Sequence, residues 1–192
     1  MFQRLLIMSV VLPFAFTGIH AQSQPRSPIL PDGVPMQERF TEADRTFIVQ
    51  AGAAHRAELL LAALAESRAK DIRVRELAAH LLRDHEIELS LLEQLATERG
   101  VTLTDISEKQ RQVAERIQAL EGDEFDRAFV TQMINDHQDQ LAFHSDMSLS
   151  PNLEVRLYAE RRITSIRDHH RRAQVIDPLP ASGRWSPDRR VR

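Results

Sequence analysis

The residues best suited to chemistry are histidines paired with acidic neighbours. Three histidines directly follow an aspartate in this chain of 192 residues: Asp84-His85, Asp136-His137 and Asp168-His169. These histidines and Glu58 each fall on the apolar stripe of a predicted helix. Carboxylates and imidazoles that project inward from several helices are typical of metal sites in bundle cores. The sequence therefore indicates Glu58, His85, His137 and His169 as candidate ligands of a transition metal ion such as iron, zinc or copper.

A purely structural role for the same residues stays open. A buried histidine is often satisfied by a backbone carbonyl or a carboxylate, and Glu58 could be such a partner. The di-iron pattern of ferritin-like oxidases needs two Glu-x-x-His motifs, and the sequence contains none. His85 and Glu88 have the reverse order. A di-iron oxidase is therefore not expected.

The predicted positions of these residues along the bundle axis favour two separate pairs of ligands, Glu58 with His169 and His85 with His137. At ~1.5 Å per residue the four residues spread over about 11 Å, which is too wide for one coordination sphere. Met133 and Met147 are expected to fill the core. The remaining histidines are expected to be peripheral: His55, His80, His144 and His170.

The segments that carry these residues are built to be helical. Residues 37–150 and 152–177 contain no proline, and glycine appears there at Gly52, Gly100 and Gly122. Helix ends are predicted by a cap at Thr41 with Asp44, a break near Asp71, a stop at Gly100, a capping box at Ser107 with Gln110, a cap at Asp123 and a start at Ser150-Pro151.

These signals predict four long helices, with a short fifth one in the connection between the second and the third. The predicted fold class is all-α: a ferritin-like four-helix bundle with one long crossover that contains a short helix. In such a path the first and last long helices run one way, and the two between them run the other way.

The two ends of the chain differ from this body. Residues 1–21 read as a secretory signal peptide, with an uncleaved membrane anchor as the alternative, and no later segment is expected to span a membrane. Residues 22–40 form a proline-rich linker, residues 41–176 the bundle, and residues 177–192 a tail rich in proline and arginine. The protein is thus expected to be exported, to the periplasm or the exterior, where it could associate with the outer membrane.

Composition excludes several function classes. The chain has no cysteine, which rules out disulfides, a thiol nucleophile and iron–sulfur clusters. Its formal charge of −3 gives no field that would attract nucleic acid, so no nucleic-acid partner is expected. No nucleophile with an adjacent base, phosphate loop or nucleotide fingerprint supports another enzyme class.

Several motifs resemble those of the bacterial domain of unknown function 4142 family. They are the run from Phe47 to Leu61, Leu81 to His85, Gly100 to Leu103, Phe125 to Phe129, Met133 to His137, and His169 with Ala173-Gln174. The resemblance covers residues 40–176. It implies an exported ferritin-like bundle, often labelled an outer-membrane protein, with Glu58, His85, His137 and His169 on recurrent polar positions and no established activity. The chain departs from the family pattern at His55 and Thr164.

Two functions are consistent with these observations. The first, narrowly favoured by the sequence, is a non-catalytic exported protein that binds an envelope component or another copy of itself, under envelope stress for example. The second is a metal-binding protein with redox activity of the bound ion as an option. Metal analysis of the purified protein separates the two.

Overall fold

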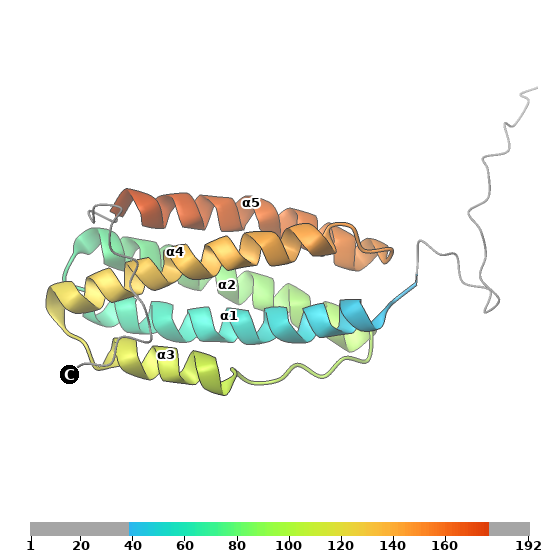
Figure 1. Ribbon diagram of the computed structural model, residues 1–192, viewed down its shortest axis with the longest axis horizontal. Coiled ribbons are helices and arrows are strands. Elements are labelled where there is room, and N and C mark those ends of the chain that lie inside the picture. Colours follow the sequence, from blue (N-terminus) through green and yellow to red (C-terminus); the bar gives the residue numbers. More distant parts are fainter. Residues whose placement is uncertain (1–38, 177–192) are drawn as a thin grey trace, which may run out of the picture.

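The protein is built from five helices, which the computed structural model describes within residues 39–176 (Figure 1). They are α1 (Glu42–Arg68), α2 (Ile72–Glu98), α3 (Glu108–Gln118), α4 (Gly122–Met147) and α5 (Leu153–Ile176). The described residues contain no strand. The all-α prediction is confirmed.

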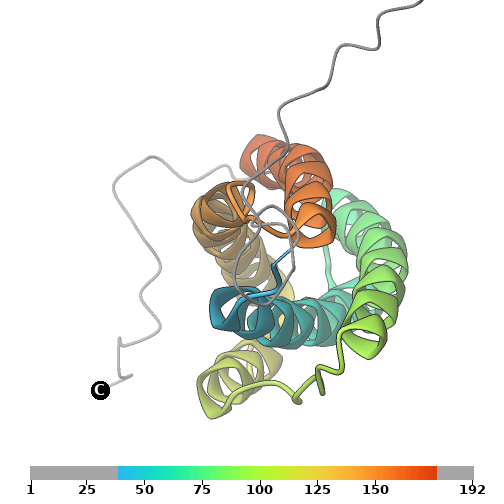
Figure 2. The ribbon, with the colours of Figure 1, turned by 90° about the vertical axis from the view of Figure 1, so that its right-hand side faces the viewer.

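The four long helices form a bundle with the predicted directions. α1 and α5 run one way, and α2 and α4 run the other way (Figure 1). Viewed from one end, the long helices surround a common centre, while α3 lies outside them beside α1 (Figure 2). Most interhelical contacts lie within two hairpins, α1 with α2 and α4 with α5. The connection between α2 and α4 is the predicted crossover with its short helix.

Most predicted helix ends are confirmed by the caps. The hydroxyl of Thr41 accepts from the backbone N–H of Asp44, whose carboxylate accepts from the backbone of Thr41 in return. Asp71 caps α2, which ends before Gly100. Gly100 has a φ of 62°, a conformation that favours glycine after a helix.

The starts of α4 and α5 differ from the prediction by one to three residues. α4 is preceded by Glu121, which makes no side-chain capping bond, and Asp123 lies in the first turn. There the Asp123 carboxylate pairs with Lys70 at 3.1 Å instead of capping the helix. α5 begins at Leu153, with Asn152 accepting from the backbone N–H of Val155.

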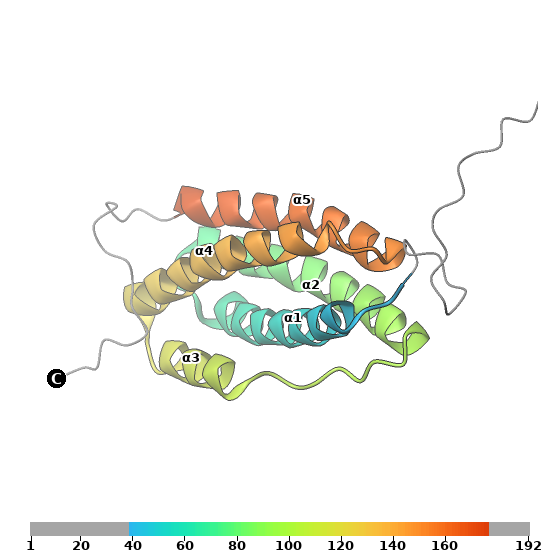
Figure 3. The ribbon, with the colours of Figure 1, turned by 45° about the vertical axis from the view of Figure 1, so that its right-hand side comes forward.

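The crossover packs along α1 (Figure 3). Gly52 leaves room for Leu103, whose side chain would lie 3.1 Å from a β-carbon at position 52. The Arg56 guanidinium donates to the carbonyl of Thr104 at 2.5 Å. Because Gly52 has no side chain, the crossover can approach α1 closely, and the hydrogen bond from Arg56 holds it there.

Two apolar clusters fill the ends of the bundle interior. One includes Leu61, Ala65, Leu77, Leu81, Phe125, Phe129, Met133 and Ala173. The other includes Phe47, Ile48, Ala51, Leu92, Leu95, Val155 and Tyr158. Seven buried polar residues separate them along the helices: His55, Glu58, His85, His137, His144, Arg162 and His169. This polar layer is the unusual part of the core.

The predicted signal peptide over 1–21, the linker up to residue 38 and the tail over 177–192 lie outside the described residues. Among the described helices, α1 alone is long and apolar enough to cross a membrane by length and composition. Of its most apolar 18-residue window, 56% is buried inside the bundle. α1 here serves as a core helix.

Candidate metal centre

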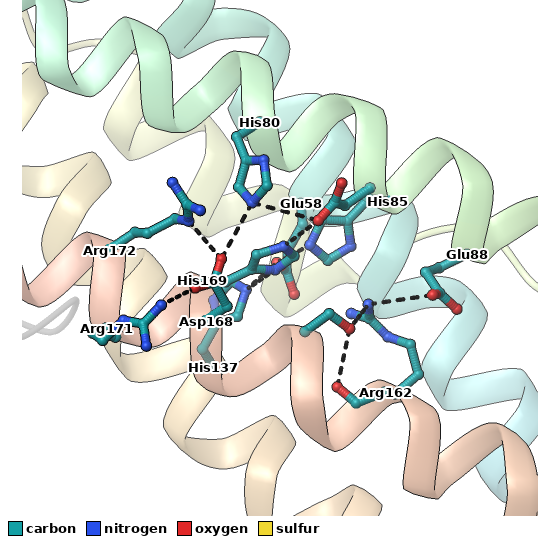
Figure 4. Close-up of polar contacts among 12 residues, drawn as sticks. Glu58, His80, His85, Glu88, His137, Arg162, Asp168, His169, Arg171 and Arg172 are labelled. Atoms are coloured by element: carbon teal, nitrogen blue, oxygen red, sulfur yellow. Dashed lines mark hydrogen bonds and ion pairs between the residues drawn. The ribbon is translucent and has the colours of Figure 1, made fainter.

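The four predicted ligands meet in the polar layer, and each long helix supplies one. Glu58 comes from α1, His85 from α2, His137 from α4 and His169 from α5. Their exposed fractions are 4%, 1%, 1% and 1%, so the site is closed to solvent at these side chains. Figure 4 shows the four side chains converging between the helices.

The donor atoms are close enough to share one ion. Ring nitrogens of His85, His137 and His169 all lie within 4.8 Å of one another. Glu58 Oε2 lies 2.9 Å from His85 Nε2 and 3.3 Å from His137 Nε2. Glu58 Oε2 and His85 Nε2 nevertheless have no hydrogen-bond partner. Donor atoms bound to one tetrahedral ion lie about 3.4 Å apart, since each is about 2.1 Å from the metal.

The prediction of two separate pairs is therefore wrong. Glu58 contacts His85 and His137, while His169 contacts His137, with 3.1 Å between Nε2 of His137 and Nδ1 of His169. The axial estimate counted backbone levels, whereas long side chains on tilted helices reach several ångströms along the bundle. That reach closes the expected gap.

Partners outside the cluster fix the tautomers of two rings. His137 Nδ1 lies 2.8 Å from the carbonyl of Met133, and His169 Nε2 lies 2.9 Å from Asp84 Oδ2. Both oxygens can only accept, so both outer nitrogens carry the hydrogen. In the neutral rings, the inner nitrogens of His137 and His169 then both present lone pairs, at 3.1 Å from each other. This is the arrangement of metal-binding histidines oriented by a carbonyl and a carboxylate.

The protonation states suit a cation. Burial lowers the pKa of His137, and burial with the neighbouring His137 and His85 lowers the pKa of His169 to about 3. These two rings are thus neutral at pH 7. Burial raises the pKa of Glu58, but the imidazoles of His85 and His137 lower it by more, so its pKa stays well below the usual range. The centre therefore holds a buried carboxylate together with the neutral rings of His137 and His169.

His55 extends the site, although the sequence placed it at the periphery. It is 3% exposed, with Nδ1 at 2.8 Å from His85 Nδ1 and Nε2 at 2.8 Å from the hydroxyl of Tyr158. Its spacing of three residues from Glu58 was the signal, since both positions lie on one face of α1. Hydrogen-bond contacts thus run from Tyr158 through His55 to His85 Nδ1. They orient His85, a predicted ligand, through the ring nitrogen that does not face Glu58.

His144 and Arg162 are buried beside these contacts, and sequence reasoning missed both roles. His144 is 2% exposed, contrary to the peripheral placement, and its ring packs at 5.2 Å from that of Phe47. Arg162 donates to the hydroxyl of Ser165 at 2.7 Å and lies 4.0 Å from Glu88. It puts a positive charge at the edge of the polar layer.

A cavity of about 810 Å³ reaches Glu58 from the side of the crossover. Small residues such as Ala53 and Ala57 on α1 face side chains from α4, among them Gln132 and Asp136. Burial, with the charge of Glu58, raises the pKa of Asp136 to about 7. Glu58 is thus the predicted ligand that lines this cavity.

Fold and site together define an all-helical bundle with one crossover and a histidine-rich polar layer across its core. The chain belongs to the family described as Domain of unknown function (DUF4142), whose model matches residues 30–176. The resemblance found in the sequence is thereby confirmed.

Solved structures of other helical proteins share this fold. A DUF305 fragment from Deinococcus radiodurans is 22% identical, with a TM-score of 0.64, and the match covers 71% of this chain and 95% of that chain. CopM in the Cu(I)-bound form is 20% identical, with a TM-score of 0.59 and the same coverage. CopM in the Cu(II)-bound form is 19% identical, with a TM-score of 0.57, covering 69% and 93%. No curated protein matches the chain.

Proposed function

We propose that this protein binds a divalent transition metal ion at the centre of its bundle. Glu58, His85, His137 and His169 hold the ion, one from each long helix. The nitrogens of the three histidines lie within 4.8 Å of one another, and Glu58 Oε2 contacts His85 and His137. Of the two functions that the sequence left open, the site geometry supports metal binding.

One observation carries the proposal. The inner nitrogens of His137 and His169 lie 3.1 Å apart, and both have lone pairs when the rings are neutral. Two lone pairs at that distance repel unless a cation or a proton lies between them. Burial disfavours the proton, because it lowers the pKa of both rings. A metal ion removes the repulsion and balances the charge of Glu58 as well.

The donor set selects the class of ion. Three imidazoles and one carboxylate suit Zn²⁺, Cu²⁺ or Fe²⁺, whereas cuprous copper prefers thiolates and thioethers. The chain has no cysteine, and Met133 is part of an apolar cluster. The copper-bound CopM structures share the fold and give copper a place among the ions to test.

The bound ion would set the direction of the hydrogen-bond chain behind His85. With a metal on Nε2, His85 must carry its hydrogen on Nδ1 and donate it to His55, which then donates to the hydroxyl of Tyr158. Burial raises the pKa of Tyr158, so this hydroxyl keeps its own proton in either direction. His55 and Tyr158 thus hold the ligand without becoming charged.

The test is metal analysis of full-length protein purified without a histidine tag, followed by titration of the metal-free protein with Zn²⁺ and Cu²⁺. We expect one tightly bound ion. The variants His85→Ala and His137→Ala should weaken its affinity by at least about 100-fold. His170→Ala is the matched control, because His170 follows His169 but is not among the clustered nitrogens.

Two results would contradict the proposal. One is a wild-type protein that binds no ion stoichiometrically, with His85→Ala destabilised by about 1–3 kcal/mol as for a structural histidine. The other is a tightly bound ion that persists when His85 and His137 are both removed.

We also propose that the protein is exported, so that the metal site lies outside the cytoplasm. Cleavage is expected at or within a few residues of Gln22, because Ile19 and Ala21 suit the positions that the peptidase reads. The intact mass of the exported protein tests this expectation. Retention of residues 1–21 would indicate a membrane-anchored protein instead. An envelope component or a second copy stays a predicted partner.

A further inference from the structure

A second cluster of metal-binding residue types lies at the seam between α2 and α5, outside the closed centre. His80 and Asp84 are four residues apart on α2. Asp168 faces His80 from α5 (Figure 4). Their side chains are 24%, 32% and 28% exposed, so solvent reaches this cluster, unlike the four central ligands. We refer to His80, Asp84 and Asp168 as the outer cluster.

The geometry of the outer cluster centres on His80. Its Nε2 lies 3.5 Å from Asp84 Oδ2 and 3.5 Å from Asp168 Oδ2. This nitrogen is buried and has no hydrogen-bond partner. The two distances from His80 Nε2 match the separation of about 3.4 Å between donors around a zinc-like ion.

His169 joins the two clusters without belonging to both. Its Nδ1 faces His137 in the centre, and its Nε2 donates to Asp84 in the outer cluster. A neutral imidazole has one lone pair, so His169 can bind one ion only. The outer donors are then the ring of His80 and the carboxylates of Asp84 and Asp168, with water to complete the coordination.

We propose that His80, Asp84 and Asp168 form a second site for a divalent transition metal ion, coupled to the central site through His169. The mixed set of one imidazole and two carboxylates suits Zn²⁺ and similar borderline ions. The coupling rests on the proposed central site, while the outer site itself does not. An ion on Asp84 weakens the hydrogen bond that orients His169, so each ion lowers the affinity for the other.

Two arginines compete with the outer ion. Arg171 and Arg172 both pair with Asp168, and Arg172 Nε lies 2.5 Å from Asp168 Oδ2. An ion must draw this carboxylate away from them, and their charges oppose a cation. The second site should accordingly be weaker than the closed one. Replacing Arg172 should strengthen it several-fold.

The experiment measures Zn²⁺ binding to the full-length, metal-free protein by equilibrium dialysis. Wild type should bind two Zn²⁺ ions, one tightly and one weakly. His80→Ala and Asp168→Asn should each weaken the second ion by at least about tenfold and keep the first. Arg172→Gln should strengthen the second ion. Asp146→Asn is the control, since it removes an exposed carboxylate near the end of α4. Circular dichroism checks that each variant folds.

A matched pair of variants separates the two sites. Glu58→Gln should lose the tight ion and keep the weak one. His80→Ala should keep the tight ion and lose the weak one. If wild type binds one Zn²⁺ and neither His80→Ala nor Asp168→Asn changes it, the outer site is refuted while the central site stands. If Glu58→Gln and wild type bind the same single weak ion, the central site fails and the outer one stands. Absence of any bound Zn²⁺ refutes both.

Discussion

Two buried carboxylates on α1 have opposite surroundings. Asp44, at the start of the helix, is 0% exposed and accepts from the backbone N–H and the hydroxyl of Thr41, each at 2.7 Å, and from the hydroxyl of Ser150 at 2.5 Å. Glu58 lies about four turns further on and is 4% exposed. Its Oε2 faces imidazole nitrogens but forms no hydrogen bond.

The difference separates a structural acid from a proposed ligand. The donors around Asp44 belong to Thr41 and Ser150. The bond from Ser150 connects the start of α1 to the segment before α5, so protein groups alone satisfy the charge of Asp44. Around Glu58 the chain supplies ring nitrogens alone, and one of them, His137 Nε2, presents a lone pair when the ring is neutral. A cation from solution can satisfy both the anion and the lone pair.

The largest expected effect is on metal affinity. Glu58→Gln removes the charged ligand and should weaken the tight ion by at least about 100-fold, whereas Asp44→Asn should leave it unchanged. Titration with Zn²⁺, followed by calorimetry, gives both values. Equal losses in the two variants would mean that Glu58 acts through the fold rather than as a ligand.

Stability of the metal-free protein should show the reverse order. Asp44→Ala leaves the hydroxyl of Ser150 without its acceptor and removes half of the capping box, and should cost about 2–4 kcal/mol. Glu58→Gln keeps the shape of the side chain but removes a charge that the neighbouring imidazoles stabilise, and should cost less than Asp44→Ala, about 1–2 kcal/mol. Urea unfolding measures both. A larger loss for Glu58→Gln would place Glu58 among the structural acids.

Acid should destabilise the polar layer through His144. Burial lowers its pKa to about 4, while the unfolded value is about 6.5. Between these pH values the unfolded chain binds a proton that the folded chain does not, so stability falls as the pH falls, by up to about 1.4 kcal/mol per unit. Asp136, with a pKa raised to about 7, has the opposite sign: its contribution is lost as the pH rises toward 7.

The measurement compares metal-free wild type with His144→Phe by urea unfolding at pH 6.5 and pH 4.5. Phenylalanine keeps the ring contact with Phe47 and cannot be protonated. Wild type should lose about 2 kcal/mol more than the variant over this interval. Identical losses would mean that His144 titrates normally in the folded protein.

The smallest expected effect comes from removing the hydrogen bond between Tyr158 and His55, which lies behind the ligand His85. Tyr158→Phe removes the hydroxyl that meets His55, and should weaken the tight ion by about threefold to tenfold and cost about 1 kcal/mol of stability. The same titration and urea experiments report it. An unchanged affinity would restrict Tyr158 to packing.

The sequence was sufficient for the fold, because helix ends depend on local chemistry. The capping boxes at Thr41 and Ser107 and the positive φ at Gly100 are formed by neighbouring residues, so their spacing predicted them. α4 differed because Glu121 precedes it without a side-chain bond, a start that leaves no pattern.

The candidate site was predicted in its members but not in its arrangement. Periodicity placed Glu58 and three histidines on inward faces, since facing inward is a property of a single helix. The contact between Asp84 and His169 depends on the rotation and stagger of α2 against α5, which no local pattern specifies. His55 could have been found, since it shares a helix face with Glu58.

The division of the ligands between the two helical hairpins has a consequence for the lifetime of the protein. Glu58 and His85 belong to α1 and α2, and His137 and His169 to α4 and α5, so a bound ion adds a cross-link between two halves that packing, hydrogen bonds and ion pairs already join. Opening the bundle then requires breaking metal bonds, which slows unfolding. Proteases should cleave the metal-free protein faster than the loaded one. The supply of metal would in that way control how long each molecule persists.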